Sequence, residues 1–332
     1  MHPTRRILLT AATLLAVGTA PLAQAQVKWD MPTGYPIGNP HTVTLSLFAK
    51  DVDTATGGKL KITVHPNGSL FKAPEIMRAV ESGQAQMGEL LMSLLANQNP
   101  IYGLDSLPFL ATGFDDAYRL WQAQRPVLER VLAKRGVKLL CAVAWPPQGI
   151  YAKRELKSGA DMKGLKWRAY NPATTKIAQA VGAQPLTIQA AELSQALATG
   201  VVDSFMSSGA TGVDSKVWES LTHFHTVDAW LPKNMLVVNQ KDFDKLDKPT
   251  QDIVVKLSAE AEKKGWERMR GFTNESLDIL RKNKMTVVTP SPQLMADMRK
   301  IGDEMLADWL KQAGPEGKEI IDAYRKSAPA KK

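Results

Sequence analysis

The stretch 161–208, DMKGLKWRAYNPATTKIAQAVGAQPLTIQAAELSQALATGVVDSFMSS, alternates short apolar runs with helical patterns. The runs LKWRAY, PLTI and VVDSFM predict strands, and the two segments between them predict helices. Asn171 followed by Pro172 is typical of a helix start. Gly182 and Gly200 are typical of helix ends. Two successive strand–helix units of this kind predict parallel strands joined by right-handed crossovers, and therefore an α/β fold.

Polar side chains follow two of these predicted strands. Arg168 and Asn171 come at the end of the first, and Ser207 and Ser208 at the end of the third. In open α/β sheets, ligands bind at the carboxyl ends of strands. The planar fork of donors on an arginine matches a carboxylate, so Arg168 is the candidate anchor for an anion. The alternative for Arg168 is a surface arginine at a strand end.

Residues 1–25 have the three parts of a secretory signal peptide. Arg5 and Arg6 precede the apolar run ILLTAATLLAVGTAPLA, and the tripeptide AQA at 23–25 is typical of a cleavage site. The alternative is an uncleaved anchor. No later stretch approaches the ~18 apolar residues of a membrane helix. We therefore expect a mature chain that is exported to the periplasm and is not embedded in a membrane.

Composition excludes several functional classes. The chain has 332 residues and a formal net charge of +9, which becomes +7 without Arg5 and Arg6. Its basic residues are spread along the chain among acidic ones, which argues against a nucleic-acid-binding surface. The single cysteine, Cys141, cannot form an internal disulfide, and its apolar run KLLCAVAW predicts a buried structural residue.

The order of predicted elements indicates two lobes linked by a hinge. The segment WPPQG at 145–149 interrupts apolar strands and predicts a first crossing between lobes. We expect a second crossing near Asn239, followed by a long helical pattern. The predicted division is a signal peptide at 1–25, lobe I at 26–147 and 239–283, lobe II at 148–238 and 284–326, and a frayed tail at 327–332.

Motifs for catalysis are missing from the sequence. It contains no G-x-S-x-G turn and no phosphate-binding glycine loop. His223 and His225 have strand spacing and could share a face, but no Cys, Asp or Glu stands at metal-ligand spacing from them. The alternative is one surface histidine and one packing histidine. We expect a binding protein, not an enzyme, with no metal and no cofactor.

A cleft between two α/β lobes is a typical site for a small molecule. Trp145 and Gln148 stand at the first crossing, Tyr35 in a Gly/Pro-rich loop of the first lobe, and Met92 after one of its strands. We expect these side chains to close over a ligand held by Arg168. The alternatives are a core position for Trp145 and a surface position for Tyr35.

Four blocks of sequence resemble a known family. They are FAKDVDTATGGKLKITVHPNGSLF, SLPFL, DMKGLKWR followed by GAQPLTIQAAELSQALATGVVDS, and VVNQKDFDKL. In this order they resemble the solute-binding proteins of tripartite ATP-independent periplasmic (TRAP) transporters of the dicarboxylate-binding DctP type, from about Trp29 to the C-terminal helix. The resemblance implies a two-lobed periplasmic binding protein of type II-like fold, with a long helix bracing both lobes. It also implies small and large membrane subunits as partners, which take up the ligand using an ion gradient. We expect a monomer.

The resemblance also assigns site residues. In the family, the arginine of the GLKWR-like motif forms a salt bridge with the ligand carboxylate, and Arg168 matches it. Ser207 stands where the family's D-G-Q-E-N-P segment has its asparagine, and Gln148 stands at or near a second arginine found in many members. Both departures argue against a doubly charged dicarboxylate or a sialic-acid-like ligand. Trp145, with Phe205 and Met206 near Arg168, would suit a monocarboxylate with an apolar or aromatic body, such as a 2-oxo acid.

The sequence therefore predicts capture of an organic-acid anion in the cleft and its delivery to TRAP membrane subunits. A ligand-presenting partner of a membrane sensor kinase is the alternative from another class. An exported hydrolase is a third possibility, without a catalytic constellation to support it.

Overall fold

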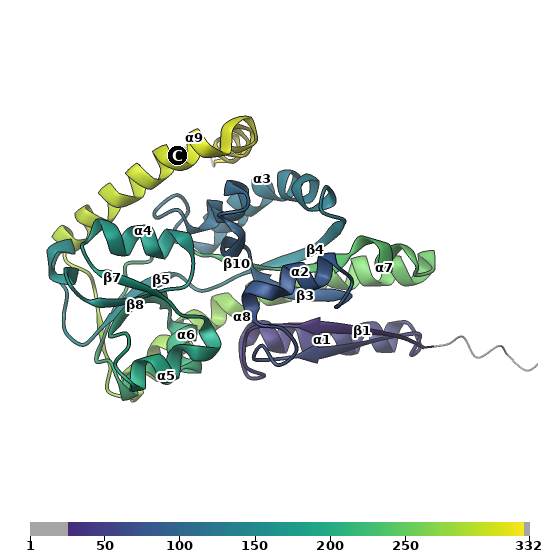
Figure 1. Cartoon of the computed structure of the whole chain (residues 1–332), viewed down its shortest axis with the longest axis horizontal. Coiled ribbons are helices and arrows are strands. Elements are labelled where there is room, and N and C mark those ends of the chain that lie inside the picture. Colours follow the sequence, from purple (N-terminus) through teal and green to yellow (C-terminus); the bar gives the residue numbers. More distant parts are fainter. Residues whose placement is uncertain (1–25, 329–332) are drawn as a thin grey trace, which may run out of the picture.

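The computed structural model describes residues 26–328. The predicted signal peptide at 1–25 and residues 329–332 of the predicted tail lie outside this range. Residues 26–328 form three sheets covered by helices (Figure 1). The strands are β1 (Val27–Pro32), β2 (Leu60–His65), β3 (Met87–Leu91), β4 (Val137–Ala144), β5 (Gln148–Ala152), β6 (Lys166–Ala169), β7 (Gln184–Thr187), β8 (Ser204–Ser208), β9 (His223–His225), β10 (Lys233–Asn239) and β11 (Thr286–Val288). The α-helices are α1 (Pro40–Ala55), α2 (Ile76–Glu81), α3 (Phe114–Ala133), α4 (Pro172–Ala180), α5 (Leu193–Ala198), α6 (Gly209–Asp214), α7 (Gln240–Asp244), α8 (Lys248–Lys282) and α9 (Pro292–Lys326).

Lobe I contains two small sheets. One is the parallel pair β1–β2, and the other has the antiparallel order β3-β10-β4. Helix α1 begins at Pro40 because the Asn39 side chain accepts a hydrogen bond from the amide of His41 at 2.8 Å. Its apolar face, including Phe48 and Val52, packs on the two sheets. The predicted burial of Cys141 is confirmed in β4.

Lobe II is built on one six-stranded sheet, with the order β11-β9-β5-β8-β6-β7. Strands β7, β6 and β8 run parallel, which confirms the arrangement expected for 161–208. The predicted helix limits are also confirmed. Asn171 accepts a hydrogen bond from the amide of Thr174 at 2.8 Å at the start of α4, and Gly182 and Gly200 follow their helices with φ of 71° and 68°. Positive φ strains side chains other than glycine.

The chain crosses from lobe I to lobe II between β4 and β5, at Trp145–Pro147, as the sequence predicts. The second crossing predicted near Asn239 is wrong. Strand β10 pairs with β3 and β4 along its whole length, starting at Lys233, so the chain has already rejoined lobe I there. Residues 233–238 therefore do not belong with lobe II. The wholly buried run KNMLVVN fills the central position of the lobe I sheet, where both of its faces are covered.

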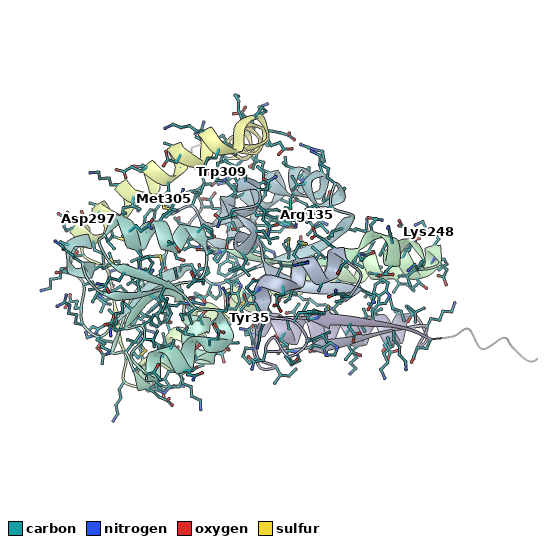
Figure 2. All side chains as sticks on the ribbon, in the orientation of Figure 1. Tyr35, Arg135, Lys248, Asp297, Met305 and Trp309 are labelled. Carbon is teal, nitrogen blue, oxygen red and sulfur yellow. The ribbon has the colours of Figure 1, made fainter. Side chains whose placement is uncertain are left out.

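Two long helical segments connect the lobes: α8, with 35 residues, and α9, whose 35 residues are interrupted by a kink at Gly314. Helix α8 contacts α1 and β4 in lobe I and α6 and β11 in lobe II, so the predicted bracing helix is present. Helix α9 also spans both lobes, although it is expected within lobe II. Near its start, the Asp297 carboxylate accepts a hydrogen bond from the amide of Gly159 at 2.8 Å; further along, the Trp309 indole donates to the carbonyl of Pro100 at 2.7 Å (Figure 2). Within residues 26–328, no helix combines the length and apolar character needed to cross a membrane.

Candidate binding site

A cavity that is partly open to solvent lies between the lobes. Tyr35 reaches it from lobe I at the junction of the two halves of the molecule (Figure 2). Five of the eight predicted site residues line the cavity. The full lining is Gly34, Tyr35, Ala73, Leu91, Leu94, Trp145, Gln148, Arg168, Tyr170, Gln189, Ala190, Ser207, Thr211 and Pro232.

Arg168 is buried at the end of β6, with 3% of its surface exposed. Its Nε donates to the carbonyl of Ile188 at 2.8 Å, and its guanidinium carbon lies 4.9 Å from the centre of the Tyr170 ring. Among residues 26–328, no carboxylate forms an ion pair with it. Burial lowers the pKa of Arg168 to about 10, so the side chain remains a cation at neutral pH.

Arg168 is also the one charged residue among the described residues that line the cavity. A buried charge without a partner is costly, and an anion in the cavity would relieve that cost. The rest of the lining is apolar, aromatic or neutral and polar. The site therefore offers one positive charge in an otherwise uncharged space.

Gln148 and Tyr170 form a pair beside this cation. The Tyr170 hydroxyl donates to Oε1 of Gln148 at 3.1 Å, and Nε2 of Gln148 donates to the carbonyl of Pro146 at 2.9 Å. The amide of Gln148 is thus already engaged at both ends. Tyr170 is not among the predicted site residues. It follows β6 directly, and its position two residues after Arg168, at strand spacing, is a signal that could have found it.

Ser207 lines the cavity from the end of β8, and its hydroxyl donates to Thr211 Oγ1 at 2.8 Å. Thr211 also lines the cavity and is missed by the sequence prediction, because it belongs to α6 after the recognised motif. Ser208 does not line it. Its buried side chain accepts a hydrogen bond from the amide of Thr211 at 3.3 Å and caps α6.

Tyr35 and Trp145 form an aromatic wall, with ring centres 4.9 Å apart. The Trp145 indole donates to Oδ1 of Asn234 at 2.8 Å. Phe205 lies under the cation, 5.9 Å from ring centre to guanidinium carbon, but neither it nor Met206 lines the cavity. Both point into hydrophobic cores instead.

Asn171 and Met92 are likewise not brought to the cavity. Met92 is fully buried in the hydrophobic core. The Asn171 side chain caps α4, and its Nδ2 donates across the lobes to Ser93 Oγ at 2.8 Å and Ser106 Oγ at 3.3 Å. Because both hydrogen bonds use its Nδ2, the Asn171 side chain links the two lobes.

A second bond between lobes lies on the side of α1. Nδ2 of Asn39, at the start of α1, donates to a carboxylate oxygen of Asp214 at the end of α6, at 2.6 Å. Asp214 is partly buried, and burial raises its pKa to about 6. Asn39 and Asn171 therefore both form hydrogen bonds between the two lobes.

The histidine pair of β9 has its ring centres 6.2 Å apart. His225 is buried: Nε2 accepts from the amide of Leu156 at 2.8 Å, and Nδ1 lies 3.1 Å from the carbonyl of Ile150. Both ring nitrogens of His225 are therefore occupied by backbone groups of the protein itself. Within residues 26–328, no group of three or more His, Cys, Asp or Glu side chains is placed to hold a metal ion.

Residues 34–312 match the family described as bacterial extracellular solute-binding protein, family 7 (DctP). The chain belongs to this family. Family 7 proteins are TRAP solute receptors of the periplasm, so the resemblance drawn from the sequence motifs is confirmed, as are a two-lobed α/β fold and a role in transport. The family and its structural neighbours are binding proteins.

Three solved structures of family 7 relatives are very similar to this protein. DctP6 of Bordetella pertussis, an extracytoplasmic solute receptor binding pyroglutamic acid, is 54% identical, with a TM-score of 0.90 over 91% of this chain and 100% of its own. DctP7 of the same organism, which also binds pyroglutamic acid, is 40% identical, with a TM-score of 0.89 over 90% and 99%. A marine metagenome TRAP protein specific for pyroglutamate is 43% identical, with a TM-score of 0.89 over 91% and 99%.

Proposed function

We propose that this family 7 protein captures a monocarboxylate with a compact neutral ring, and that 5-oxoproline (pyroglutamate) is its ligand. The observation that carries the proposal is the single buried cation of the cavity, Arg168, which lacks a carboxylate partner among residues 26–328. One carboxylate matches one guanidinium. A second carboxylate would find no cation in the lining and would have to lose its hydration without compensation.

The rest of the lining suits the body of such a ligand. Tyr35 and Trp145, whose rings are tilted by 59° to each other, offer apolar aromatic surface to the body of a ring, and Ser207 and Thr211 offer hydroxyls for a lactam N–H and C=O. The three similar receptors that bind pyroglutamate support this choice over the aromatic and 2-oxo acids that the sequence alone suggests.

The proposed cycle uses hinge motion of the two lobes. The anion first meets Arg168, whose free nitrogens donate to the carboxylate, and closure then brings Tyr35 over the other side. Exclusion of water strengthens the ion pair. The loaded, exported protein delivers the ligand to the small and large TRAP membrane subunits. No observation in residues 26–328 favours the alternative of a sensor-kinase partner.

Isothermal titration calorimetry of the mature protein with 5-oxoproline, succinate, malate and pyruvate tests this proposal. We expect tight binding of 5-oxoproline and binding of succinate or malate at least a hundredfold weaker. A thermal-shift series with the same acids gives an independent ranking, because ligand binding raises stability by mass action. Tight binding of succinate with none of 5-oxoproline would refute the proposal.

A further inference from the structure

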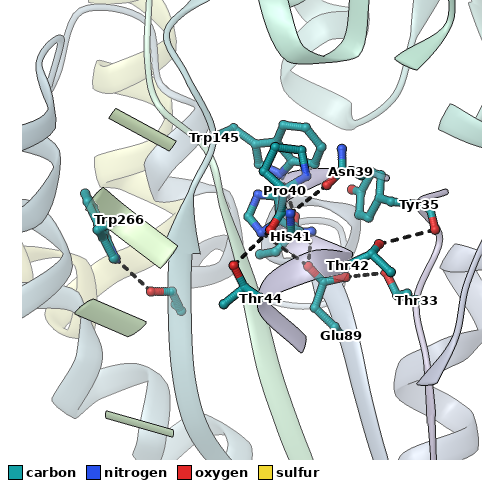
Figure 3. A network of polar contacts seen from close by, with 12 residues as sticks. Thr33, Tyr35, Asn39, Pro40, His41, Thr42, Thr44, Glu89, Trp145 and Trp266 are labelled. Atoms are coloured by element: carbon teal, nitrogen blue, oxygen red, sulfur yellow. Dashed lines mark hydrogen bonds and ion pairs between the residues drawn. The ribbon is translucent and has the colours of Figure 1, made fainter. Parts of the chain in front are cut away.

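A buried carboxylate lies behind the aromatic wall of the cavity (Figure 3). Glu89 stands in the middle of β3 with 3% of its surface exposed. Its Oε2 accepts a hydrogen bond from the Thr33 hydroxyl at 2.6 Å, and its Oε1 accepts one from Nδ2 of Asn234. Among residues 26–328, no lysine or arginine forms an ion pair with it.

Two routes join Glu89 to the cavity wall. Asn234, which donates to Glu89, accepts the indole N–H of Trp145 at 2.8 Å on its other side. The His41 ring lies between the two residues, with Nδ1 3.5 Å from Glu89 Oε1 and its ring centre 4.4 Å from that of Trp145 (Figure 3). The orientation of Trp145 therefore depends on the hydrogen bonds that Glu89 accepts.

Few other titratable groups face Glu89. They are His41 on α1, Tyr35 in the loop before α1, and Cys141 on β4. Burial raises the pKa of Glu89 to about 7 and lowers that of His41 to about 3. Burial also raises the pKa of Tyr35 and of Cys141, so both stay protonated. Glu89 is thus the group in this cluster that changes charge near neutral pH.

The charge of Glu89 reaches the cavity. Besides burial, the charge of Glu89 raises the pKa of the Tyr35 hydroxyl, whereas the charge of Arg168 lowers it. The charges of both residues therefore act on this residue of the cavity lining. An ionised Glu89 places a negative charge behind a site whose ligand is itself negative. Binding of the anion and ionisation of Glu89 therefore oppose each other.

We propose that Glu89 is a proton-sensitive positioning residue of the carboxylate site: through Asn234 and His41 it fixes the Trp145 indole, and its ionisation weakens capture of the anion. The effect of Glu89 on capture of the anion rests on the proposed function. The effect of Glu89 on the orientation of the Trp145 indole does not, because it can be measured without any ligand.

The first test is the pH dependence of the dissociation constant for 5-oxoproline. Between pH 6 and pH 8 we expect the affinity of the wild type to fall roughly three- to tenfold, the size of a single charge acting through the protein interior. Glu89→Gln keeps an acceptor for Asn234 but cannot ionise, so its affinity should not change over this range. Equal pH profiles for the wild type and Glu89→Gln would overturn the capture part of the proposal.

The chain offers a matched control in Glu262. This second buried glutamate accepts a hydrogen bond directly from an indole, that of Trp121, at 3.3 Å, and burial raises its pKa as it raises that of Glu89. It does not line the cavity. Glu262→Gln should keep the pH profile of the wild type. A profile as flat as that of Glu89→Gln would overturn the assignment to Glu89.

The second test needs no ligand. The indole N–H of Trp145 is followed by ¹⁵N NMR and identified by its loss in Trp145→Phe. We expect its chemical shift to titrate near neutral pH in the wild type and in Glu262→Gln, and to be constant in Glu89→Gln. A shift that does not titrate in the wild type would overturn the positioning part. Failure of 5-oxoproline to bind the wild type at any pH would instead refute the proposed function and, with it, the capture part.

Discussion

Two buried cations, Lys233 and Arg168, differ in whether the chain supplies their counter-charge. Lys233, at the start of β10, is fully buried with Nζ 3.3 Å from Oδ2 of Asp105, which also accepts the backbone N–H of Lys233 at 2.7 Å. Arg168 is buried to a similar degree and has no carboxylate partner among residues 26–328. The paired cation is part of the fold. The unpaired cation remains available to an anion that enters the cavity. Two cations of similar burial can therefore have different roles, one in stability and one in binding.

The largest expected effect is on the paired site. Lys233→Met leaves Asp105 buried without a counter-charge, so the free energy of unfolding should fall by about 3–5 kcal/mol. Urea denaturation measures this fall. The double variant Lys233→Met with Asp105→Asn removes both charges, keeps an acceptor for the backbone N–H of Lys233, and should recover most of the loss. A fall of less than about 1 kcal/mol in the single variant would mean that the pair does not support the fold.

The reverse pattern is expected at Arg168. Arg168→Met should weaken 5-oxoproline binding by about 2–5 kcal/mol, as for removal of one partner of a buried charge pair. The ligand-free protein should be as stable as the wild type or more so, because an uncompensated charge has been removed. Calorimetry and urea denaturation of the same variant give both values. Unchanged affinity would remove Arg168 from the site.

A milder substitution sharpens the comparison. Arg168→Lys retains the charge but not the planar fork, so binding should weaken by about 1.5–3 kcal/mol, the contribution of one hydrogen bond to a charged group. Calorimetry with 5-oxoproline measures the loss. An affinity equal to that of the wild type would show that charge alone, without bidentate geometry, holds the ligand.

The smallest expected effect is the pH dependence of stability that comes from Asp214, a partly buried carboxylate that has no cationic partner among residues 26–328. Burial raises the pKa of Asp214 to about 6, above its ordinary value of 3.8. The folded protein then binds more protons than the unfolded chain between these values, so stability should fall as pH rises through this window. After allowance for partial exposure we expect about 1–2 kcal/mol.

Asp214→Asn provides the comparison for this pH dependence. It keeps an acceptor for Asn39 and cannot ionise, so its unfolding free energy should lack this part of the fall between pH 4 and pH 6. Urea denaturation at several pH values measures both proteins. The same slope in Asp214→Asn and the wild type would assign the pH dependence to other groups.

Local patterns in the sequence were enough to predict the elements of 161–208, their caps and the position of Arg168 at a strand end. The place where the chain returns to lobe I was not predictable in this way, because the apolar sequence of β10 contains no information on which sheet the strand joins. Thr211 escaped prediction because it reaches the cavity only after strands β6 and β8 are placed side by side, whereas the spacing of Tyr170 from Arg168 was a signal that the sequence did contain. Asn171 illustrates the same limit, since its partners Ser93 and Ser106 are 78 and 65 residues away in sequence.

The cross-lobe bonds of Asn171 and Asn39 have a kinetic consequence. Opening the cleft must break them before the ligand can leave, and each is worth about 0.5–1.5 kcal/mol. Because water replaces these bonds once the lobes separate, they raise the barrier to opening more than they change the final balance. We therefore expect the residence time of the ligand to depend partly on side chains outside the cavity lining.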